Sequence, residues 1–234
     1  ASPISEDTLL RAIEIMGCEF WQVYGLTETS GIGTTLAPEC HDPSSGKLRS
    51  CGKKYSGVDI KIVDQKGAEV FPGEVGEITI KSSVVMKGYW NRDEANKESI
   101  IDGWFYSGDA GYFDEDGFLF IYDRVKDMII SGGENIYPAE VENALMHHPD
   151  VIDAAAVGVP DDKWGETVKG FVVLKKDSKV RESDLIAATK NLIASYKCPS
   201  SINFITEMPR NPSGKILRRE LRAPFWEDGK RNVS

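Results

Sequence analysis

A run of charged residues at positions 123–127 divides the sequence into two stretches with different hydrophobic patterns. Before it, apolar and polar residues alternate over short segments that are separated by glycine-containing turns, which is typical of antiparallel strands. After it, apolar residues also recur at helical spacing, so strands are mixed with amphipathic helices. Such a run can be a solvated linker. The pair Gly132 and Gly133 just beyond it favours a hinge between two parts of one site.

Composition restricts the classes of function. The chain has 234 residues, of which 41% are hydrophobic, enough for one large or two modest domains. Its net charge of −9 argues against binding to nucleic acid or to anionic membranes, but leaves anionic small ligands open. No apolar run is long enough to span a bilayer, and the first residues do not have the features of a signal peptide. The four cysteines show no paired spacing, so we expect reduced thiols, a cytoplasmic protein and no zinc site.

The first stretch begins with a predicted helix that Ser5 caps and Gly17 ends. Residues 20–24 are expected to form a short buried strand that leads into a turn-rich segment. Because this helix starts almost at the first residue, we interpret the chain as a fragment that begins inside a domain. Residues 51–122 are all β in pattern, with strands near 58–62, 75–80 and 118–122, and this spacing predicts a small barrel or a distorted sheet.

The second stretch is expected to be a small α+β domain. Pro138 is well placed to open a helix, and a second helix should include Leu185, Leu192 and Ile193. Buried strands are predicted at 154–157, 170–174 and 202–205, and a basic helix from Ile216. His147 and His148 fit a solvated helix end better than a metal site.

One candidate site lies at residues 24–28, where a strand runs into a loop. An aromatic ring such as Tyr24 can stack on a purine, the hydroxyl of Thr27 can bond a phosphate, and the carboxylate of Glu28 can hold Mg²⁺. A core tyrosine beside a solvated glutamate would explain the same residues, and for this motif alone that reading is favoured.

A second candidate is the carboxylate of Asp109, which lies between Gly108 and Gly111. Its two oxygens could accept both hydroxyls of a ribose, although a solvated aspartate in a β-turn is the simpler reading. Arg124 ends the last strand before the charged boundary and could bond ribose or phosphate oxygens. The alternative for Arg124 is a surface ion pair with Asp123 or Asp127.

A third candidate is Lys215, in a loop shaped by Pro212 and Gly214. Most loop lysines are merely solvated. One that projects into a phosphate site would stabilise the charge that develops when a carboxylate attacks an α-phosphate.

Each motif is weak alone, but their order and spacing together are distinctive. The chain resembles the C-terminal part of the adenylate-forming superfamily, which includes acyl- and aryl-CoA synthetases, adenylation domains of peptide synthetases and firefly luciferase. Residues 131–142 are most similar to the acyl-CoA synthetase branch, particularly to fatty-acid and aromatic-acid ligases. The matching stretches are residues 24–28, 103–109, 123–142, 161–166 and 209–219, so the resemblance extends over nearly the whole chain.

The resemblance implies an α+β fold in two parts. Residues 1–125 would be the end of a large AMP-binding domain, with a distorted β-barrel at about 51–123, and residues 126–234 a small mobile C-terminal domain that turns about Lys126. The implied reaction has two steps. ATP and a carboxylic acid give an acyl-adenylate and diphosphate with Mg²⁺, and the thiol of coenzyme A then takes the acyl group and releases AMP.

The resemblance also implies roles for individual residues. Tyr24 would stack on adenine beside Gly25, Thr27 would contact phosphate, and Glu28 would bind Mg²⁺. Asp109 would hold the ribose hydroxyls, with Ile121 and Arg124 also at the nucleotide, and Lys215 would drive adenylation. Gly132 and Gly133 would line the pantetheine channel, and Trp164 would pack on the CoA nucleotide.

Two departures from the family pattern matter. The Gly/Ser/Thr-rich phosphate loop is absent and most of the acyl pocket would lie upstream, so we expect this piece alone to be inactive. Ser200 and Ser201 stand where many family members carry Lys or Arg near the 3′-phosphate of CoA, leaving Lys197 as the nearest cation. Three readings therefore stay open: an acyl-CoA synthetase, an adenylating enzyme with another acceptor such as a carrier-protein pantetheine or oxygen, and a non-catalytic nucleotide-binding or interaction module. The acid and the oligomeric state are not predicted.

Overall fold

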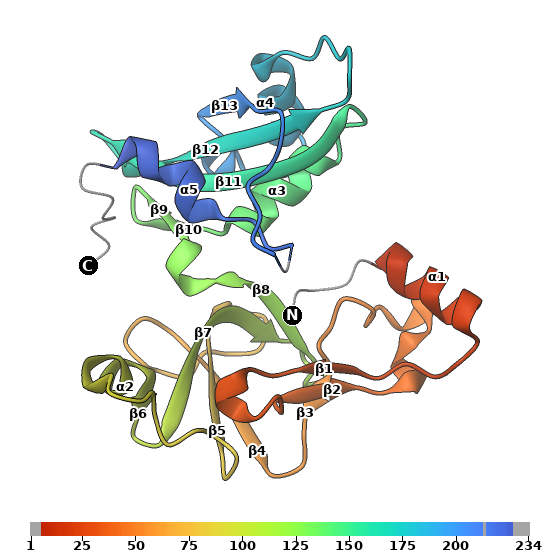
Figure 1. Ribbon diagram of the computed structural model, residues 1–234, viewed down its shortest axis with the longest axis vertical. Coiled ribbons are helices and arrows are strands. Elements are labelled where there is room, and N and C mark those ends of the chain that lie inside the picture. The colour runs from red at the N-terminus through yellow and green to blue at the C-terminus, as the bar shows by residue number, and fades with distance from the viewer. Residues whose placement is uncertain (1–5, 213, 227–234) are drawn as a thin grey trace. The chain divides into compact units, whose positions relative to one another are not determined.

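The computed structural model describes residues 6–212 and 214–226 (Figure 1). By its internal contacts the chain divides into two compact units, residues 1–125 and 126–234. Each unit has its own hydrophobic core, and each is described by itself.

The first unit opens with helix α1 (Glu6–Met16). The N–H of Gly17 donates to the carbonyl of Ile13 at 3.0 Å, and Gly17 has a φ of 59°, so the helix ends where the sequence predicts. The predicted cap Ser5 lies outside the described residues. Leu9 is buried, whereas Ile15 and Met16 are exposed.

A three-stranded antiparallel sheet follows, formed by β1 (Gln22–Tyr24), β2 (Thr34–Leu36) and β3 (Lys53–Lys54). The 3₁₀ turns η1 (Thr27–Thr29), η2 (Pro38–His41) and η3 (Pro43–Ser45) lie between these strands. The prediction of a fully buried strand at residues 20–24 is wrong. Only Tyr24 is buried and Val23 is 61% exposed, because successive side chains of a strand point to opposite faces and one face of β1 remains uncovered by the described residues.

The rest of the unit is a curled, half-barrel sheet of antiparallel strands, which confirms the expectation of a distorted barrel. Its strands are β4 (Val58–Val63), β5 (Gly76–Ser82), β6 (Ile100–Ile101), β7 (Trp104–Phe113) and β8 (Leu119–Arg124). The prediction that residues 51–122 are all β is wrong at α2 (Asp93–Ser99), a short helix that precedes β6. The strands β6 and β8 pair with different parts of β7, near Phe105 and near Tyr112 respectively. Ile60, Ile78 and Leu119 lie in the apolar cluster that this curled sheet encloses.

The second unit contains a five-stranded sheet with the order β10-β9-β12-β11, and β13 pairs in parallel with β12. The strands are β9 (Ile129–Ser131), β10 (Glu134–Ile136), β11 (Val151–Asp161), β12 (Gly165–Leu174) and β13 (Ser201–Phe204). The helices are α3 (Pro138–Met146), α4 (Glu182–Lys190) and α5 (Arg218–Arg222). Shorter turns are η4 (Val125–Asp127) at the junction of the units, η5 (Ser195–Lys197) and η6 (Ala223–Phe225).

Helices cover both faces of this second sheet. Ala154 and Ala156 of β11 lie in one apolar cluster with residues of α3 and α4, whereas Ala155 and Val157 lie in another with Leu221 of α5. This alternation follows the two-residue period of a strand. The continuous apolar runs of β11 and β12 are therefore explained by burial on both faces, with α3 and α5 on opposite sides (Figure 1).

Two helix predictions in the second unit are wrong at their ends. The predicted helix that includes Leu192 and Ile193 stops at Lys190, and Leu192 is 52% exposed. The basic helix begins at Arg218 because Ile216 forms an isolated β-bridge with Arg210. The predicted helix start at Pro138 is confirmed.

Among the described residues, no helix is both long enough and apolar enough to cross a membrane.

Packing of the half barrel gives a direct test. Ile78 of β5 is fully buried, so Ile78→Ala should lower the free energy of unfolding by about 2–5 kcal/mol, because it leaves a cavity in the core. Ile101→Ala, at a side chain that is 41% exposed in the same sheet, should cost less than about 1 kcal/mol. Urea unfolding followed by circular dichroism measures both, and equal losses would contradict the assignment of this core.

Candidate functional site

Three predicted site residues meet in the first unit, around the carboxylate of Asp109. The hydroxyl of Tyr24 donates to Oδ2 of Asp109 at 2.9 Å, and Nη1 of Arg124 lies 2.7 Å from Oδ1. Strand pairing explains the second contact, because Asp109 of β7 is directly opposite Arg124 of β8. Arg124 thus pairs with Asp109 and also donates to the carbonyl of Ser107 at 3.3 Å. This cluster is called the Asp109 cluster below.

The backbone that carries Asp109 is itself held in place. The hydroxyl of Ser107 donates to the carbonyl of Ile78 at 2.6 Å and accepts the N–H of Asp109 at 3.1 Å. The N–H of Gly108 donates to a carboxylate oxygen of Glu77 at 2.9 Å. The pairing register shifts in β5 after Glu77 and in β7 after Ala110, on either side of this part of β7.

Burial and the negative charge of Asp109 set the acidity of the surrounding groups. Burial, reinforced by Asp109, raises the pKa of Tyr24 well above its ordinary value, so this phenol stays a hydrogen-bond donor. Burial also raises the pKa of the Cys51 thiol to about 11. For Glu77, burial raises the pKa more than the N–H of Gly108 lowers it. A guanidinium and a phenol therefore stabilise one carboxylate in a partly buried setting.

The carboxylate of Asp109 can accept further hydrogen bonds from a ligand. A carboxylate has about four lone-pair positions on its two oxygens, and one on each is used by Tyr24 and Arg124. Its side chain is 13% exposed and that of Arg124 is 41% exposed. Vicinal hydroxyls, as in a ribose, are suitable donors to such a group.

Thr27 and Glu28 lie together on the 3₁₀ turn η1, directly after β1. The turn is closed by Thr29, whose hydroxyl accepts the N–H of Leu26 at 3.0 Å. The carbonyl of Glu28 accepts the N–H of Met86 at 2.7 Å, and its carboxylate accepts the hydroxyl of Tyr89 at 2.8 Å. Thr27 is exposed, so its hydroxyl is accessible to a ligand.

Gly25 and Ile121 have structural explanations. A Cβ on Gly25 would lie 2.3 Å from the carbonyl carbon of Gly31, so this glycine permits two chain segments to approach closely. Ile121 of β8 packs against the apolar cluster of the half barrel. Both residues support the elements that carry Tyr24 and Arg124.

In the second unit, the structure brings Gly132 and Trp164 together. The N–H of Gly132 donates to the carbonyl of Trp164 at 2.9 Å, and a Cβ on Gly132 would lie 2.8 Å from the indole. Gly133 has nothing within 4 Å of where a Cβ would be. Trp164 is 49% exposed, and Nζ of Lys163 lies 4.3 Å from its ring centroid. Glycine at position 132 therefore lets the turn between β9 and β10 lie against an aromatic surface.

Lys215 is exposed on the loop between β13 and α5, and Lys126 is exposed at the junction of the units. The candidate residues thus form separate groups: the Asp109 cluster, the η1 turn, the Gly132–Trp164 contact and the Lys215 loop. Sequence reasoning missed Tyr89 and Glu77, which support Glu28 and Gly108. Neither contact could be predicted from neighbouring residues in the sequence, since Tyr89, for example, is 61 positions from Glu28.

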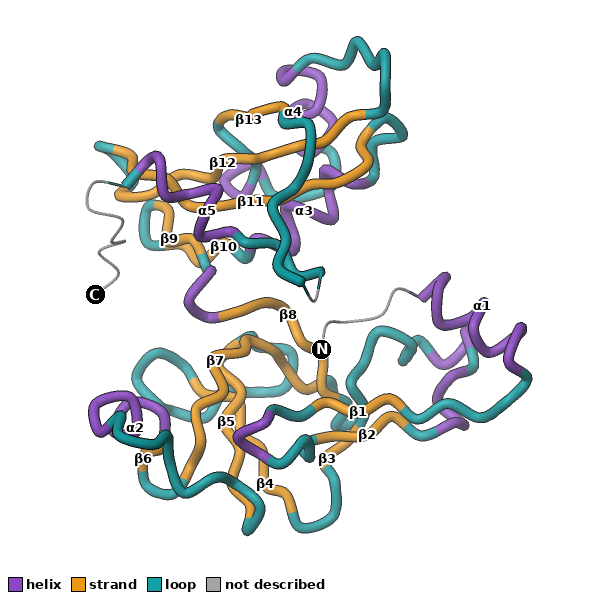
Figure 2. Tube along the Cα trace, viewed as in Figure 1, coloured by secondary structure: helices purple, strands orange, loops and turns teal. Residues whose placement is uncertain are grey.

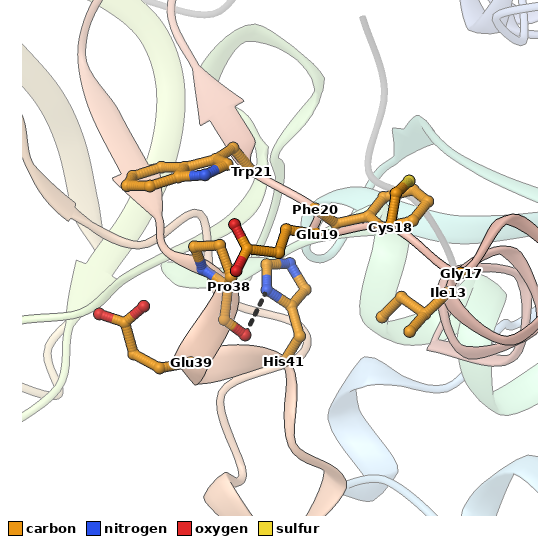
Figure 3. Close-up of a pocket in the computed structure, with 9 residues that line it drawn as sticks. All are labelled: Ile13, Gly17, Cys18, Glu19, Phe20, Trp21, Pro38, Glu39 and His41. Carbon is orange, nitrogen blue, oxygen red and sulfur yellow. Dashed lines mark hydrogen bonds between the residues drawn. The ribbon is translucent and has the colours of Figure 1, made fainter.

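An open pocket of about 670 Å³ lies elsewhere in the first unit, between the end of α1 and η2 (Figure 3). Figure 3 shows His41, Glu19 and Trp21 at its walls, and Nδ1 of His41 lies 3.3 Å from the carbonyl of Pro38. Its described lining residues include none of the candidates above. In the described part of the chain, no three His, Cys, Asp or Glu residues gather as a metal site, and the four cysteines are free.

Comparisons with known proteins identify related chains. A family model described as AMP-binding enzyme matches residues 1–90, and one described as AMP-binding enzyme C-terminal domain matches residues 140–215. A fatty acid–[acyl-carrier-protein] ligase of Streptomyces coeruleorubidus is 46% identical over 233 residues, which are 100% of this chain and 45% of that protein. A 2-succinylbenzoate–CoA ligase of Geobacillus kaustophilus is 47% identical over 214 residues, 92% of this chain and 43% of that protein.

A solved structure of similar fold is o-succinylbenzoate CoA synthetase from Bacillus subtilis in complex with an acyl-adenylate intermediate. The TM-score is 0.82 at 42% identity, covering 94% of this chain and 44% of that one. The chain therefore spans less than half the length of the relatives it matches.

The raised pKa of Tyr24 predicts a loss of stability at high pH. The protonated phenol contributes fully below its ordinary pKa of 10.0, and this contribution is lost as pH rises above that value, because the unfolded chain ionises first. The free energy of unfolding should fall by up to about 1.4 kcal/mol per pH unit above pH 10 from this group. Tyr24→Phe should remove this contribution to the pH dependence of the free energy of unfolding, measured by urea unfolding between pH 9 and 11. Tyr55→Phe, at an exposed phenol, should retain it, and identical slopes in the two variants would contradict the prediction.

Proposed function

The chain belongs to the adenylate-forming, AMP-binding enzyme family, and from this premise we propose that the intact protein is an AMP-forming acid–thiol ligase. It would activate a carboxylic acid with ATP and transfer the acyl group to a thiol, with coenzyme A as the leading acceptor. The observation that supports this most directly is the Asp109 cluster. A carboxylate held by Tyr24 and Arg124, with lone pairs to spare, suits the paired hydroxyls of a nucleotide ribose.

In the first step, a carboxylate oxygen of the acid bonds to the α-phosphorus of ATP. The bond from that phosphorus to the bridging oxygen breaks, and diphosphate leaves with the electron pair. We propose that Asp109 holds the ribose, Arg124 assists there, and Tyr24 lies beside adenine with Gly25 and Ile121 supporting the site. Thr27 would bond a phosphate oxygen, and the ammonium of Lys215 would stabilise the charge that develops at the phosphate.

Glu28 fits a role in holding Mg²⁺. Mg²⁺ is commonly bound through one or two carboxylates, with phosphate oxygens and water completing its coordination. The hydroxyl of Tyr89 orients the Glu28 carboxylate at 2.8 Å, on the same turn as Thr27. When bound, Mg²⁺ would neutralise phosphate charge.

In the second step, the sulfur of the thiol bonds to the acyl carbon, the bond from that carbon to the phosphate oxygen breaks, and AMP and the thiol proton are released. We propose that Gly132, Gly133 and Trp164 serve this step. Gly133 leaves open space beside the backbone, and the half-exposed indole of Trp164 offers an apolar surface for the acceptor. Lys126 would be the hinge that lets one small domain, residues 126–234, serve both steps in turn.

We further propose that residues 1–234 alone do not complete adenylation. The chain spans less than half the length of the relatives it matches, and by the family pattern the loop that holds the β- and γ-phosphates and most of the acyl pocket would belong to the remainder. The identity of the acid would be decided there.

A carrier-protein pantetheine is the second candidate acceptor, and contacts around Ser200 and Ser201 favour it. Nζ of Lys197 is 2.7 and 2.9 Å from the two carboxylate oxygens of Glu140, so its charge is already compensated. Nζ of Lys169 donates to Ser201 at 3.0 Å and lies 5.1 Å from the Phe225 ring centroid. The expectation that Lys197 is the nearest cation is therefore wrong, because Lys169 is the lysine that contacts Ser201. A 3′-phosphate would meet this one ammonium, already engaged by Ser201 and Phe225, where many family members carry Lys or Arg, whereas a carrier-bound pantetheine has no 3′-phosphate.

Lys215→Ala tests the division of labour between the steps. In the intact protein with ATP and a panel of carboxylic acids, wild type should release diphosphate, and the variant should do so at least about 100-fold more slowly, because an electrostatic stabiliser is lost. Thiolation of supplied acyl-adenylate should change by less than about twofold. Lys176→Ala, at an exposed loop lysine, should leave both steps unchanged. Equal loss in both steps would refute the proposed role, and no acid-dependent diphosphate release by wild type would refute the ligase itself.

Dephospho-CoA tests the acceptor. If Lys169 stays bound to Ser201 and does not contact the 3′-phosphate, kcat/KM for CoA and dephospho-CoA should agree within about threefold, a difference of less than 1 kcal/mol. Ser200→Arg should shift the ratio in favour of CoA by about 5- to 10-fold, the size expected for one charge-assisted contact. A wild-type preference for CoA above about tenfold would show that the 3′-phosphate is recognised, and would count against the carrier protein as acceptor.

A further inference from the structure

The loop between β13 and α5, residues 205–217, is long and irregular, yet both of its ends are anchored (Figure 2). Met208 near its start and Leu221 of α5 are buried in the same apolar cluster, which also contains Phe171 and Val157 of the sheet. The loop therefore leaves one face of the second unit's sheet and returns to it. Residue 213 lies outside the described residues.

The backbone of Lys215 is fixed although its side chain is exposed. Its N–H donates to Oδ1 of Asn211 at 2.9 Å, and its carbonyl accepts the N–H of Asn211, also at 2.9 Å. The N–H of Gly214 donates to the carbonyl of Asn211 at 2.9 Å. One residue step further out, Arg210 and Ile216 form a β-bridge. The peptide groups around Lys215 are thus hydrogen-bonded to Asn211 on the opposite side of the loop, while the side chain is exposed.

A single guanidinium connects this hairpin-like loop to the sheet. Nη1 of Arg210 donates to the carbonyl of Gly214 at 2.6 Å, and Nη2 lies 2.6 Å from Oδ2 of Asp153 in β11. The other oxygen of Asp153 accepts the N–H of Ala154 at 3.0 Å, so the carboxylate is oriented by its own strand. Arg210 therefore links Asp153 of β11 to the carbonyl of Gly214, the residue directly before Lys215.

A second guanidinium holds the far end of the segment. Arg218 forms a fork on Glu142 of α3, with Nε–Oε1 at 3.0 Å and Nη2–Oε2 at 2.7 Å. Oε1 of Glu142 also accepts the N–H of Ala156 at 2.9 Å. Because α5 is fastened by Arg218 and Leu221, the part of the loop whose position depends on Arg210 is the hairpin around Lys215.

We infer that Arg210, held by Asp153, is a positioning residue that aims Lys215 at the reacting phosphate. This rests on the proposed function, in which Lys215 assists adenylation, and it adds a residue that touches neither substrate nor reacting atoms. Arg210 is 41% exposed in its side chain, so its ion pair contributes little to global stability. Its effect should appear in the rate of one step, because a displacement of about 1 Å at a catalytic group can cost about 100-fold.

The experiment compares four variants of the intact protein in the two steps separately. Arg210→Gln removes the charge and the fork and should slow diphosphate release about 10- to 100-fold, with KM for ATP nearly unchanged. Arg210→Lys should be intermediate, since an ammonium is a single point charge and does not reproduce the two-acceptor fork. Asp153→Asn should resemble the lysine variant. Arg181→Gln, which breaks an exposed Arg–Asp pair of the same unit, is the matched control and should retain wild-type rates.

Three further measurements separate positioning from a general structural role. In a Lys215→Ala background, Arg210→Gln should have no additional effect on adenylation, because the group it positions is gone. Thiolation of supplied acyl-adenylate should stay within about twofold of wild type in every Arg210 variant. Hydrogen exchange of the peptide covering residues 209–217 should become faster in Arg210→Gln and Asp153→Asn, with other regions unchanged.

The possible results of these measurements either support or overturn the inference. Faster exchange in the loop together with selective, non-additive loss of adenylation supports the inference. Adenylation within about twofold of wild type in Arg210→Gln, equal loss in both steps, or a further loss on top of Lys215→Ala would overturn it. If Arg210→Gln does not fold, Asp153→Asn carries the same test. A Lys215→Ala variant with normal adenylation would instead contradict the proposed function, whatever Arg210 does.

Discussion

The pairing of Asp109 with Arg124 across β7 and β8 is the contact on which the candidate site depends. It joins the last two strands of the half barrel at the point where the first unit ends, and Tyr24 joins the same carboxylate from a different sheet. Because the acceptor of the Tyr24 hydroxyl is a carboxylate, this hydrogen bond is stronger than one between neutral groups, and burial raises the pKa of Tyr24 so that the phenol remains the donor. Strand register, more than loop flexibility, therefore decides where a nucleotide could be held.

Much of the architecture follows from local pattern. Alternation in residues 58–63 and 76–82, the glycine after α1 and the proline at the start of α3 each have one dominant local explanation, and each predicted element is present. The errors lie at boundaries where tertiary contacts compete with pattern. Ile216 lies two residues before α5 but pairs with Arg210 as a bridge, and Val23 belongs to an apolar run whose strand packs on one face only.

The candidate site was less predictable than the fold, for a physical reason. Asp109, Arg124 and Glu28 could be proposed from residue type and from their resemblance to family motifs, although each also had an ordinary structural explanation when taken alone. Their partners are set by long-range pairing: Glu77 meets Gly108 through neighbouring strands, and Tyr89 meets Glu28 across 61 positions. The contact of Gly132 with the indole of Trp164 likewise joins residues that are far apart in the sequence.

Lys215 and Trp164 are both exposed, so burial in the core fixes the position of neither residue. The structure fixes their backbones by polar contacts instead. The carboxylate of Asp161 accepts the N–H groups of Lys163 and Trp164 at 2.9 Å each, while Asn211 and Arg210 hold the peptides around Lys215. Hydrogen bonds of this kind add little to global stability but restrict the local chain. Under the proposed function, a small domain that presents two different groups in two steps would need exposed side chains on well-ordered backbones. In this unit, aspartate, asparagine and arginine side chains hold the backbone at both positions.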